Sequence, residues 1–150
     1  MNDIDFMRAA LDEARAAGER GEVPVGAVVV REGRILASAG NENRARNNPS
    51  RHAEMIAMER ACAALGNERL TGCDLYATKE PCAMCAGAIV HARIRRLVIG
   101  ARDLRYGACG TVLQVCGNSA LNHRPEIEFG LLGDEAADLL LDFFRAKREP

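Results

Sequence analysis

The N-terminal segment, residues 1–20, carries apolar side chains at the spacing of an amphipathic helix. Four of them recur three or four positions apart: Ile4, Met7, Leu11 and Ala14. Polar and charged residues fill most of the positions between them, so one side of the segment is suited to packing and the other to water. The pattern predicts a first helix that ends near Gly18 or Gly21.

The apolar pattern then changes from helical spacing to extended runs. Residues 23–30 are apolar and rich in β-branched side chains, the polar stretch 31–34 has the composition of a turn, and residues 35–39 are apolar again. These features predict a β-hairpin. Residues 40–49 are polar and rich in asparagine, and we expect them to form a loop.

Helices and strands alternate through the middle of the chain. The apolar spacing of residues 52–65 predicts a helix, for which Ser50 can serve as the N-terminal cap and Gly66 as the stop. Residues 81–91 predict a second helix, because a proline stands in its first turn. Short apolar segments predict strands at residues 73–78, 97–101 and 127–129.

The C-terminal segment, residues 134–148, predicts a last helix with acids in its first turn and bases in its last. Its expected buried side consists of Leu139, Leu140, Phe143 and Phe144. Residues 102–124 show no clear period, and a loop of this length in a compact domain is usually functional. The order of elements predicts a single domain, residues 1–150, with a three-layer α/β/α fold and a mixed sheet of about five strands.

Composition is typical of one globular domain. The chain has 150 residues, of which 48% are hydrophobic and 27% charged. Its N-terminal segment lacks the apolar run of a secretory signal or a membrane span, so we expect an intracellular, cytoplasmic protein without a membrane partner. The six cysteines are then expected to serve a metal site or the core, because intracellular thiols stay reduced.

Charge is distributed unevenly along the chain. The formal net charge is -1, so a polyanionic partner requires a local basic patch. Residues 91–105 contain five arginines and one aspartate, and three further bases lie near the C-terminus. Such runs are as often a solvated surface as a binding site, and the sequence leaves both interpretations open.

The strongest candidate for chemistry combines His52, Cys82 and Cys85. His52 opens one predicted helix, and the Cys82–Cys85 pair opens the next. Both helix starts are expected at the same edge of the sheet, where α/β folds bind ligands. Cys82 and Cys85 share one face of their helix, whose N-terminal dipole favours the thiolate form. One histidine and two cysteines leave tetrahedral Zn²⁺ a position for water, and this arrangement predicts a catalytic zinc site with one ion.

Glu54 is the expected general acid and base of this site. Two thiolates offset the charge of the metal, so a nearby carboxylate is needed to help deprotonate the attacking water. Positions i and i+2 of a helix point in nearly opposite directions, so His52 and Glu54 converge only if the metal lies over the helix end. Transfer of the proton to a departing amine makes hydrolytic displacement of an amine the predicted reaction.

Other interpretations of these motifs exist. A Cys-x-x-Cys pair at a helix start also occurs in redox proteins and in structural zinc sites. A structural site needs a fourth ligand, and the remaining cysteines lack paired spacing and are simpler to explain as small buried side chains: Cys62, Cys73, Cys109 and Cys116. His91 and His123 are expected to have structural or hydrogen-bonding roles.

The combination His-x-Glu and Pro-Cys-x-x-Cys resembles the signature of the zinc-dependent deaminases. Nearly the whole chain resembles the bacterial tRNA-specific adenosine deaminases. The resemblance is carried by EVPVGAVVV at 22–30, HAE at 52–54, EPCAMCAGAIVHARI at 80–94, GARD at 100–103, NHRPEI at 122–127 and the terminal FFRAKR. HAE and PCxMC are shared with cytosine and guanine deaminases and identify the superfamily only.

This resemblance implies conversion of adenosine to inosine at the wobble position of a tRNA anticodon, by a homodimer with one zinc per subunit and no organic cofactor. By position, Asn41 resembles the residue that holds the target base, and Val25 and Ala53 resemble pocket residues. Four residues resemble positions near the anticodon loop: Arg102, Asp103, Phe144 and Arg145. The alternatives are a free guanine or cytosine deaminase and an RNA-binding subunit without turnover, although the latter has no use for Glu54.

Overall fold

A single mixed sheet organises the computed structural model, which describes residues 1–148. Its strands lie in the order β2-β1-β3-β4-β5. They are β1 (Gly26–Arg31), β2 (Arg34–Gly40), β3 (Cys73–Lys79), β4 (Arg96–Ala101) and β5 (Glu126–Phe129). The helices are α1 (Asp3–Glu19), α2 (Asn43–Arg46), α3 (Ala53–Leu65), α4 (Ala83–Ala92) and α5 (Gly133–Arg148).

Strand β1 is antiparallel to both of its neighbours, whereas β3, β4 and β5 run parallel to one another. The predicted hairpin joins β1 to β2 through Glu32 and Gly33, which both have positive φ, as a tight turn between twisted strands requires. Since β2 and β3 are both antiparallel to β1, they run in the same direction. The helices that connect β2 to β3 and β3 to β4 therefore start at the same edge of the sheet.

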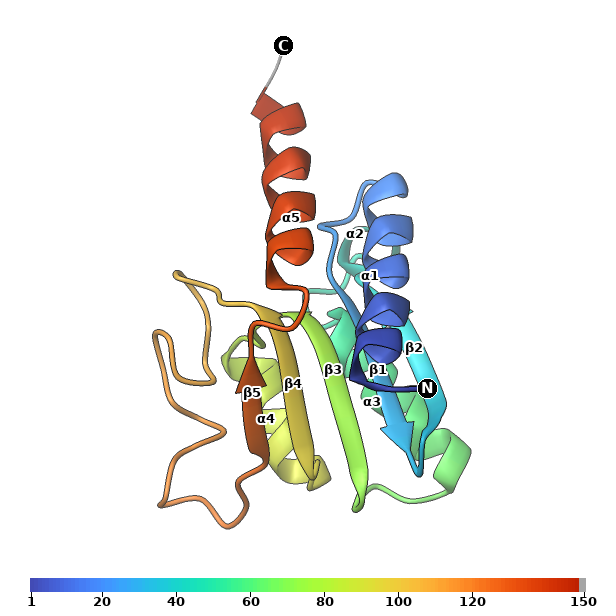
Figure 1. The fold of residues 1–150 in the computed structure, drawn as a ribbon, viewed down its shortest axis with the longest axis vertical. Coiled ribbons are helices and arrows are strands. Elements are labelled where there is room, and N and C mark those ends of the chain that lie inside the picture. The colour runs from blue at the N-terminus through green and yellow to red at the C-terminus, as the bar shows by residue number, and fades with distance from the viewer. Residues whose placement is uncertain (149–150) are drawn as a thin grey trace.

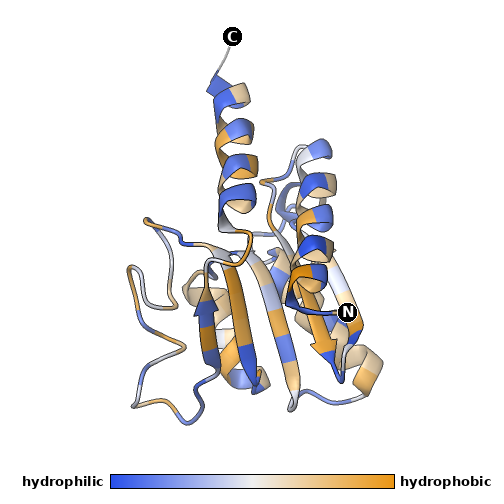
Figure 2. Ribbon diagram, in the orientation of Figure 1, coloured by the Kyte–Doolittle hydropathy of each residue, from blue (hydrophilic) through white to orange (hydrophobic). Residues whose placement is uncertain are grey.

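Helices cover both faces of the sheet, and this confirms the predicted three-layer α/β/α fold (Figure 1). One apolar cluster joins α1 and the start of α5 to alternate positions of the central strands, including Val28, Tyr76 and Val98. The intervening positions, such as Val29, face the opposite layer with α3 and α4. Figure 2 shows apolar residues along β1 and β4, whereas polar and apolar residues alternate on the edge strand β5.

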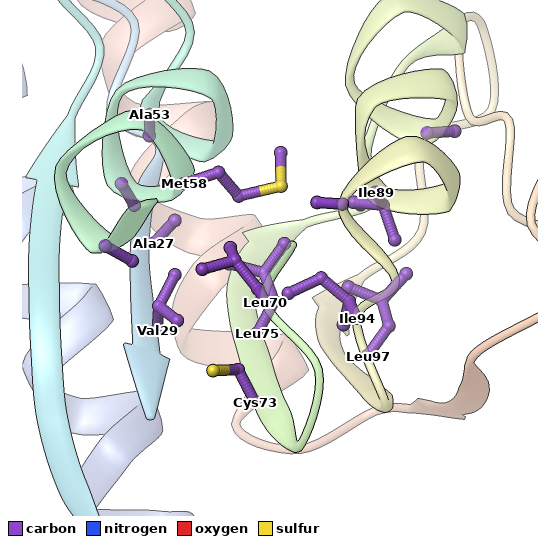
Figure 3. Close-up of a cluster of buried hydrophobic side chains, with 14 of the residues drawn as sticks. Ala27, Val29, Ala53, Met58, Leu70, Cys73, Leu75, Ile89, Ile94 and Leu97 are labelled. Carbon is purple, nitrogen blue, oxygen red and sulfur yellow. The ribbon is translucent and has the colours of Figure 1, made fainter. Parts of the chain in front are cut away.

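The larger core lies between the sheet and the helices α3 and α4. In Figure 3, Met58 from α3 and Ile89 from α4 lie above Leu75 of the central strand. Ile89 and Leu75 are fully buried, and Met58 is nearly so. Burying such a side chain contributes about 1.5–3 kcal/mol, so this layer fixes the two helices relative to each other.

Several helix boundaries differ from the sequence-based prediction. Helix α3 begins at Ala53 with His52 at the cap position, and Ser50 instead bonds Asn48. Prediction of a Ser50 cap was therefore wrong. The short helix α2 lies within the stretch expected to be a loop, where the N–H groups of Arg44 and Ala45 donate to the distant carboxylate of Glu22.

Helix α5 is less buried than its sequence indicated. Leu139 and Leu140 are half-buried, but Phe144 is 45% exposed, so the prediction that Phe144 packs in the core was wrong. Figure 1 shows the reason, because the second half of α5 extends beyond the end of the sheet. Residues 102–124 contain neither helix nor strand in the described structure, apart from an isolated bridge between Cys109 and Gln114. No helix within residues 1–148 combines the length and apolarity needed to cross a membrane.

Helix α1 approaches β1 so closely that Gly26 has no room for a side chain. A Cβ atom at this position would lie 1.9 Å from the carbonyl oxygen of Ala10 and 2.7 Å from the nitrogen of Ala14. Both of these are backbone atoms of α1, so the helix would have to move as a whole. Gly87 in α4 is different, because a Cβ there would meet no atom within 4 Å.

We expect Gly26→Ala to lower the free energy of unfolding by about 3 kcal/mol or more, since overpacking against backbone exceeds the usual cost of an added methyl group. The matched control, Gly87→Ala, is expected to be neutral or to stabilise the protein by about 0.5–1 kcal/mol, because alanine favours the helix. Urea denaturation followed by circular dichroism measures both. Equal stability of the two variants would contradict this account of the α1–β1 contact.

Candidate metal and catalytic centre

The structure brings His52, Cys82 and Cys85 together at the starts of α3 and α4. His52 directly precedes α3, Cys82 directly precedes α4, and Cys85 lies in the first turn of α4. The His52 Nδ1 atom is 3.6 Å from the Sγ atom of Cys82 and 3.4 Å from that of Cys85. All three donor atoms lie within 4.8 Å of one another, which is a separation that a single metal ion can bridge.

The two cysteines of the group differ in acidity. A hydrogen bond from the Cys85 thiol is the main reason that the pKa of Cys82 is lowered to about 3, and the bond with His52 adds to this effect. The same contact with Cys82, together with burial, raises the pKa of Cys85. Since thiolates and imidazole nitrogens are the donors that Zn²⁺ prefers, the residues present fit this ion.

Glu54 lies beside the three donors and is not part of them. Its side chain is 4% exposed, and within residues 1–148 its Oε1 atom is buried without a hydrogen-bond partner. Burial is the main cause of a raised pKa for this carboxyl group. An unsatisfied buried carboxylate oxygen is costly, so its retention here is consistent with a proton-transfer role toward a bound reactant.

A cavity of about 450 Å³ opens onto His52, Glu54 and Cys82. Of the residues expected to contact substrate, Val25, Asn41 and Asp103 line this cavity. Ala53 does not, because its side chain is fully buried. The remaining lining residues were not among the expected substrate contacts: Glu22, Val23, Asn43, Arg44, Lys79, Glu80 and Tyr106.

Asn41 joins three segments of the cavity wall. Its Oδ1 atom accepts the Ala53 N–H at 2.8 Å, and its Nδ2 group donates to the Val23 carbonyl at 3.2 Å. These bonds orient the amide, yet each of its polar atoms retains capacity for one more partner. Asn41 therefore fixes the start of α3 and also lines the cavity.

Two buried carboxylates bind backbone N–H groups at the two rims of the cavity. Glu22, 2% exposed, accepts from Arg44 at 3.0 Å and from Ala45 at 2.9 Å, and so holds the short helix α2. Glu80, 1% exposed, accepts from the segment that contains Asp103. Sequence reasoning missed both residues, and the available signal was an acid directly beside each motif, at EVPVG and EPC.

A second hollow of about 500 Å³ adjoins the first and shares Lys79, Asp103 and Tyr106 with it. It runs between the segment after β4 and the exposed part of α5. Its other lining residues include Arg102 and Phe144, which were expected near the substrate, and three further bases: Arg105, Lys147 and Arg148. Arg145 is exposed, lies 3.9 Å from Asp142 and does not line either hollow.

Asp103 stands where the two hollows meet. Lys79 Nζ lies 3.1 Å from its Oδ2 atom, while the N–H groups of Arg105 and Tyr106 donate to Oδ1. Burial acts to raise the pKa of the Asp103 carboxyl group, but these N–H groups and the Lys79 ammonium outweigh it and lower the pKa. Asp103 is therefore held as a carboxylate.

The predicted basic stretch is divided by the structure. Arg95 pairs with Asp74 at 2.8 Å, and Arg96 binds Asp3 and Glu128 at 2.6 Å each. These contacts lie at the start of β4, whereas Arg102 and Arg105 follow its other end. Of the basic stretch 91–105, whose role the sequence left open, only the last part lies beside the cavity and the second hollow.

Comparisons with known proteins agree on the class. The family model described as MafB19-like deaminase matches residues 1–148. The tRNA-specific adenosine deaminase of Agrobacterium fabrum is 50% identical over 143 residues, covering 95% of this chain and 94% of that protein. A solved structure from a study of A-to-I editing by tRNA:A34 deaminases at the wobble position of transfer RNA is 49% identical, with a TM-score of 0.88, covering 91% of this chain and 99% of that one.

A more distant likeness is also present. The structure of guanine deaminase from Nitrosomonas europaea is 26% identical and has a TM-score of 0.83, covering 95% of this chain and 84% of that chain. The two architectures are thus similar, while the sequence is much nearer to the tRNA-specific proteins.

We expect Cys85→Ala to lose bound Zn²⁺ and to unfold at a lower temperature, because a tetrahedral site with two protein ligands binds weakly and metal binding contributes to folding. Cys62→Ala is the matched control, since Cys62 is partly buried in α3 and belongs to no group of potential ligands in residues 1–148. Elemental analysis and thermal denaturation give the two readouts. A fully metallated Cys85→Ala protein would exclude this cysteine from the site.

Proposed function

Since the chain belongs to the MafB19-like deaminases and to the tRNA-specific adenosine deaminases, we propose that it converts adenosine to inosine at the wobble position of a tRNA anticodon. The observation that carries this proposal is the buried oxygen of Glu54, which has no hydrogen-bond partner in the described part of the chain and lies beside His52, Cys82 and Cys85 at a cavity. The reaction is a hydrolysis, and the enzyme is a hydrolase.

One Zn²⁺ per subunit, held by His52, Cys82 and Cys85, is part of the proposal. When bound, the ion supplies the Lewis acidity that lets water act as a nucleophile near neutral pH. The donor set supports this assignment, because its three members come from rigid helix starts and leave room on the cavity side. No organic cofactor is needed for a hydrolysis of this kind.

Glu54 carries the protons in this mechanism. Water adds its oxygen to C6 of adenine, and Glu54 takes a proton from that water and passes it to N1 of the ring. A second proton then moves through the same carboxylate to the amino group, the C6–N bond breaks, and ammonia leaves. The products are inosine and ammonia, so atoms and charge balance without any redox partner.

The cavity walls are suited to an extruded purine nucleotide. Asn41 offers one free N–H and one lone pair, and Val25 adds apolar surface beside it. A base in an unpaired loop can be splayed into such a cavity at a small cost in stacking. Ala53 then acts through its backbone N–H, which orients Asn41, and not as a wall of the pocket.

The second hollow supports contact with an anticodon stem-loop. It lies directly beside the cavity and carries Arg102, Arg105, Lys147 and Arg148, whose cations suit backbone phosphates. Phe144 is 45% exposed there and offers a ring face for stacking of a neighbouring base. Because the formal net charge is -1, the protein depends on these arginine and lysine side chains for RNA affinity.

Assembly as a homodimer, in the cytoplasm, completes the proposal. Four large apolar side chains on α4 and on the segment after β4 are 38–52% exposed: Met84, Val112, Leu113 and Leu121. This segment packs on α4 through Cys116, whose thiol lies 3.7 Å from the Ala86 carbonyl. Exposed large apolar side chains are typical of interfaces when they form a patch, and the molar mass in solution tests the assembly.

The test of substrate is incubation of zinc-loaded protein with an anticodon stem-loop that has adenosine at the wobble position. Nucleoside analysis is expected to find inosine at that position alone, and none from free adenosine, guanine or cytosine supplied in parallel. KM for the RNA is expected to rise steeply with salt, because binding of the arginine and lysine side chains releases counterions from the phosphates. Deamination of a free base with the RNA unchanged would overturn the substrate and keep the mechanism.

We expect Glu54→Gln to retain zinc and RNA affinity while the rate of inosine formation under single-turnover conditions falls by about 10²–10⁴-fold, the usual contribution of general acid–base catalysis. Gln is nearly isosteric, so the cavity keeps its shape and the loss reports proton transfer. Elemental analysis and filter binding serve as controls on the same preparation. Turnover at the normal rate would refute the role of Glu54.

A further inference from the structure

Glu80 is a buried carboxylate at the end of the central strand that the chemistry of deamination does not use. It follows β3 directly, precedes the Pro81-Cys82 motif and is 1% exposed. No lysine, arginine or histidine forms a salt bridge with it within residues 1–148. A buried charge without a counterion must be stabilised by hydrogen-bond donors, so its partners indicate its role.

Within residues 1–148, all four groups that donate to the Glu80 side chain come from one segment, residues 103–111. The Oε1 atom accepts from the Asp103 N–H at 3.1 Å and from the Thr111 hydroxyl at 2.5 Å. The Oε2 atom accepts from the N–H groups of Cys109 at 3.0 Å and Thr111 at 3.2 Å. One carboxylate therefore binds both ends of a segment that has neither helix nor strand of its own.

The contact continues outward to Arg102. The Thr111 hydroxyl has one proton, which it donates to Glu80, and its oxygen accepts from Nη1 of Arg102 at 3.1 Å. The guanidinium carbon of Arg102 also lies 3.8 Å from the ring centroid of Phe129. Glu80 thus orders Arg102 through Thr111, and Asp103 through its backbone N–H.

The fit of the segment around Glu80 is tight. A Cβ atom at Gly107 would lie 2.5 Å from Cδ and Oε1 of Glu80 and 2.5 Å from the Asp103 carbonyl oxygen. The backbone at Gly107 therefore lies directly against the carboxylate. Asp103 and Tyr106 line both the cavity and the second hollow. A shift of this segment therefore moves the walls of both together.

We infer that Glu80 is a positioning residue for RNA recognition, which sets the placement of Arg102, Asp103 and Tyr106 around the target nucleotide. The inference rests on the proposed function, because it names how that same site holds its substrate. Glu80 does not contact the reacting atoms in this role, and its effect belongs to substrate affinity and not to the chemical step.

Glu80→Gln tests the inference with little change in size. The amide keeps one acceptor oxygen and turns its NH₂ group toward N–H donors, so part of the donor set loses its partner. We expect KM for the anticodon stem-loop to rise about tenfold or more, as loss of charge-assisted hydrogen bonds would produce, while kcat changes less than about threefold. Trypsin should also cleave the folded variant faster after Arg102 and Arg105, a readout that needs no substrate.

Two further variants make the test specific. Thr111→Val removes the hydroxyl and should raise KM in the same direction, and its effect should not add to that of Glu80→Gln, because both changes break one contact. Asp74→Asn is the matched control, since Asp74 is a buried carboxylate at the other end of β3 that binds Arg95. It should lower stability without raising KM.

Each outcome decides the inference. Unchanged KM and unchanged proteolysis in Glu80→Gln would overturn it, as would a fall in kcat or in zinc content at constant KM, which would place Glu80 with the metal motif. If Glu80→Gln does not fold, a normal KM in Thr111→Val overturns it instead. Failure of the unaltered protein to act on any RNA would refute the proposed function separately, while faster proteolysis of the variant would still show that Glu80 orders the segment.

Discussion

The shared direction of the strands before and after α3 and α4 is the constraint on which the site depends. Strands β2, β3 and β4 run in one direction, and α3 and α4 pack on the same face of the sheet. Each helix must therefore start at the edge where the preceding strand ends. His52 and Cys82 stand at these starts, so the topology brings the donors together before any metal binds.

The acidic groups of the site are buried, whereas its basic groups lie at the surface, and the two sets have different roles. Glu22 and Glu80 are buried and stabilised by backbone N–H groups, whereas Glu54 keeps a free oxygen for the reaction. Arg102 and Arg105 remain at the surface beside the cavity. Positive charge is thus concentrated beside the cavity, although the formal net charge of the chain is -1.

The order of the elements and the convergence of His52 with Cys82 and Cys85 follow from local sequence, because periodicity and motif spacing are local properties. The failures concern longer-range effects. Ser50 does not cap α3, because His52 occupies the cap position. Arg96 is not available to a polyanion, because it forms a salt bridge with Asp3, which is distant in sequence. Glu80 was missed for the same reason, since its donors are 23 to 31 positions away along the chain.

Glu22 and Glu80 anchor the cavity rims through main-chain N–H groups, so the side chains of the rims are free to change during evolution. Glu22 binds the N–H groups of residues 44 and 45, and Glu80 binds those of residues 103, 109 and 111. Every amino acid except proline supplies this N–H, so the side chains at most of these positions can be exchanged while the scaffold keeps its shape. Substrate preference can therefore evolve at the rims independently of the machinery that performs the hydrolysis.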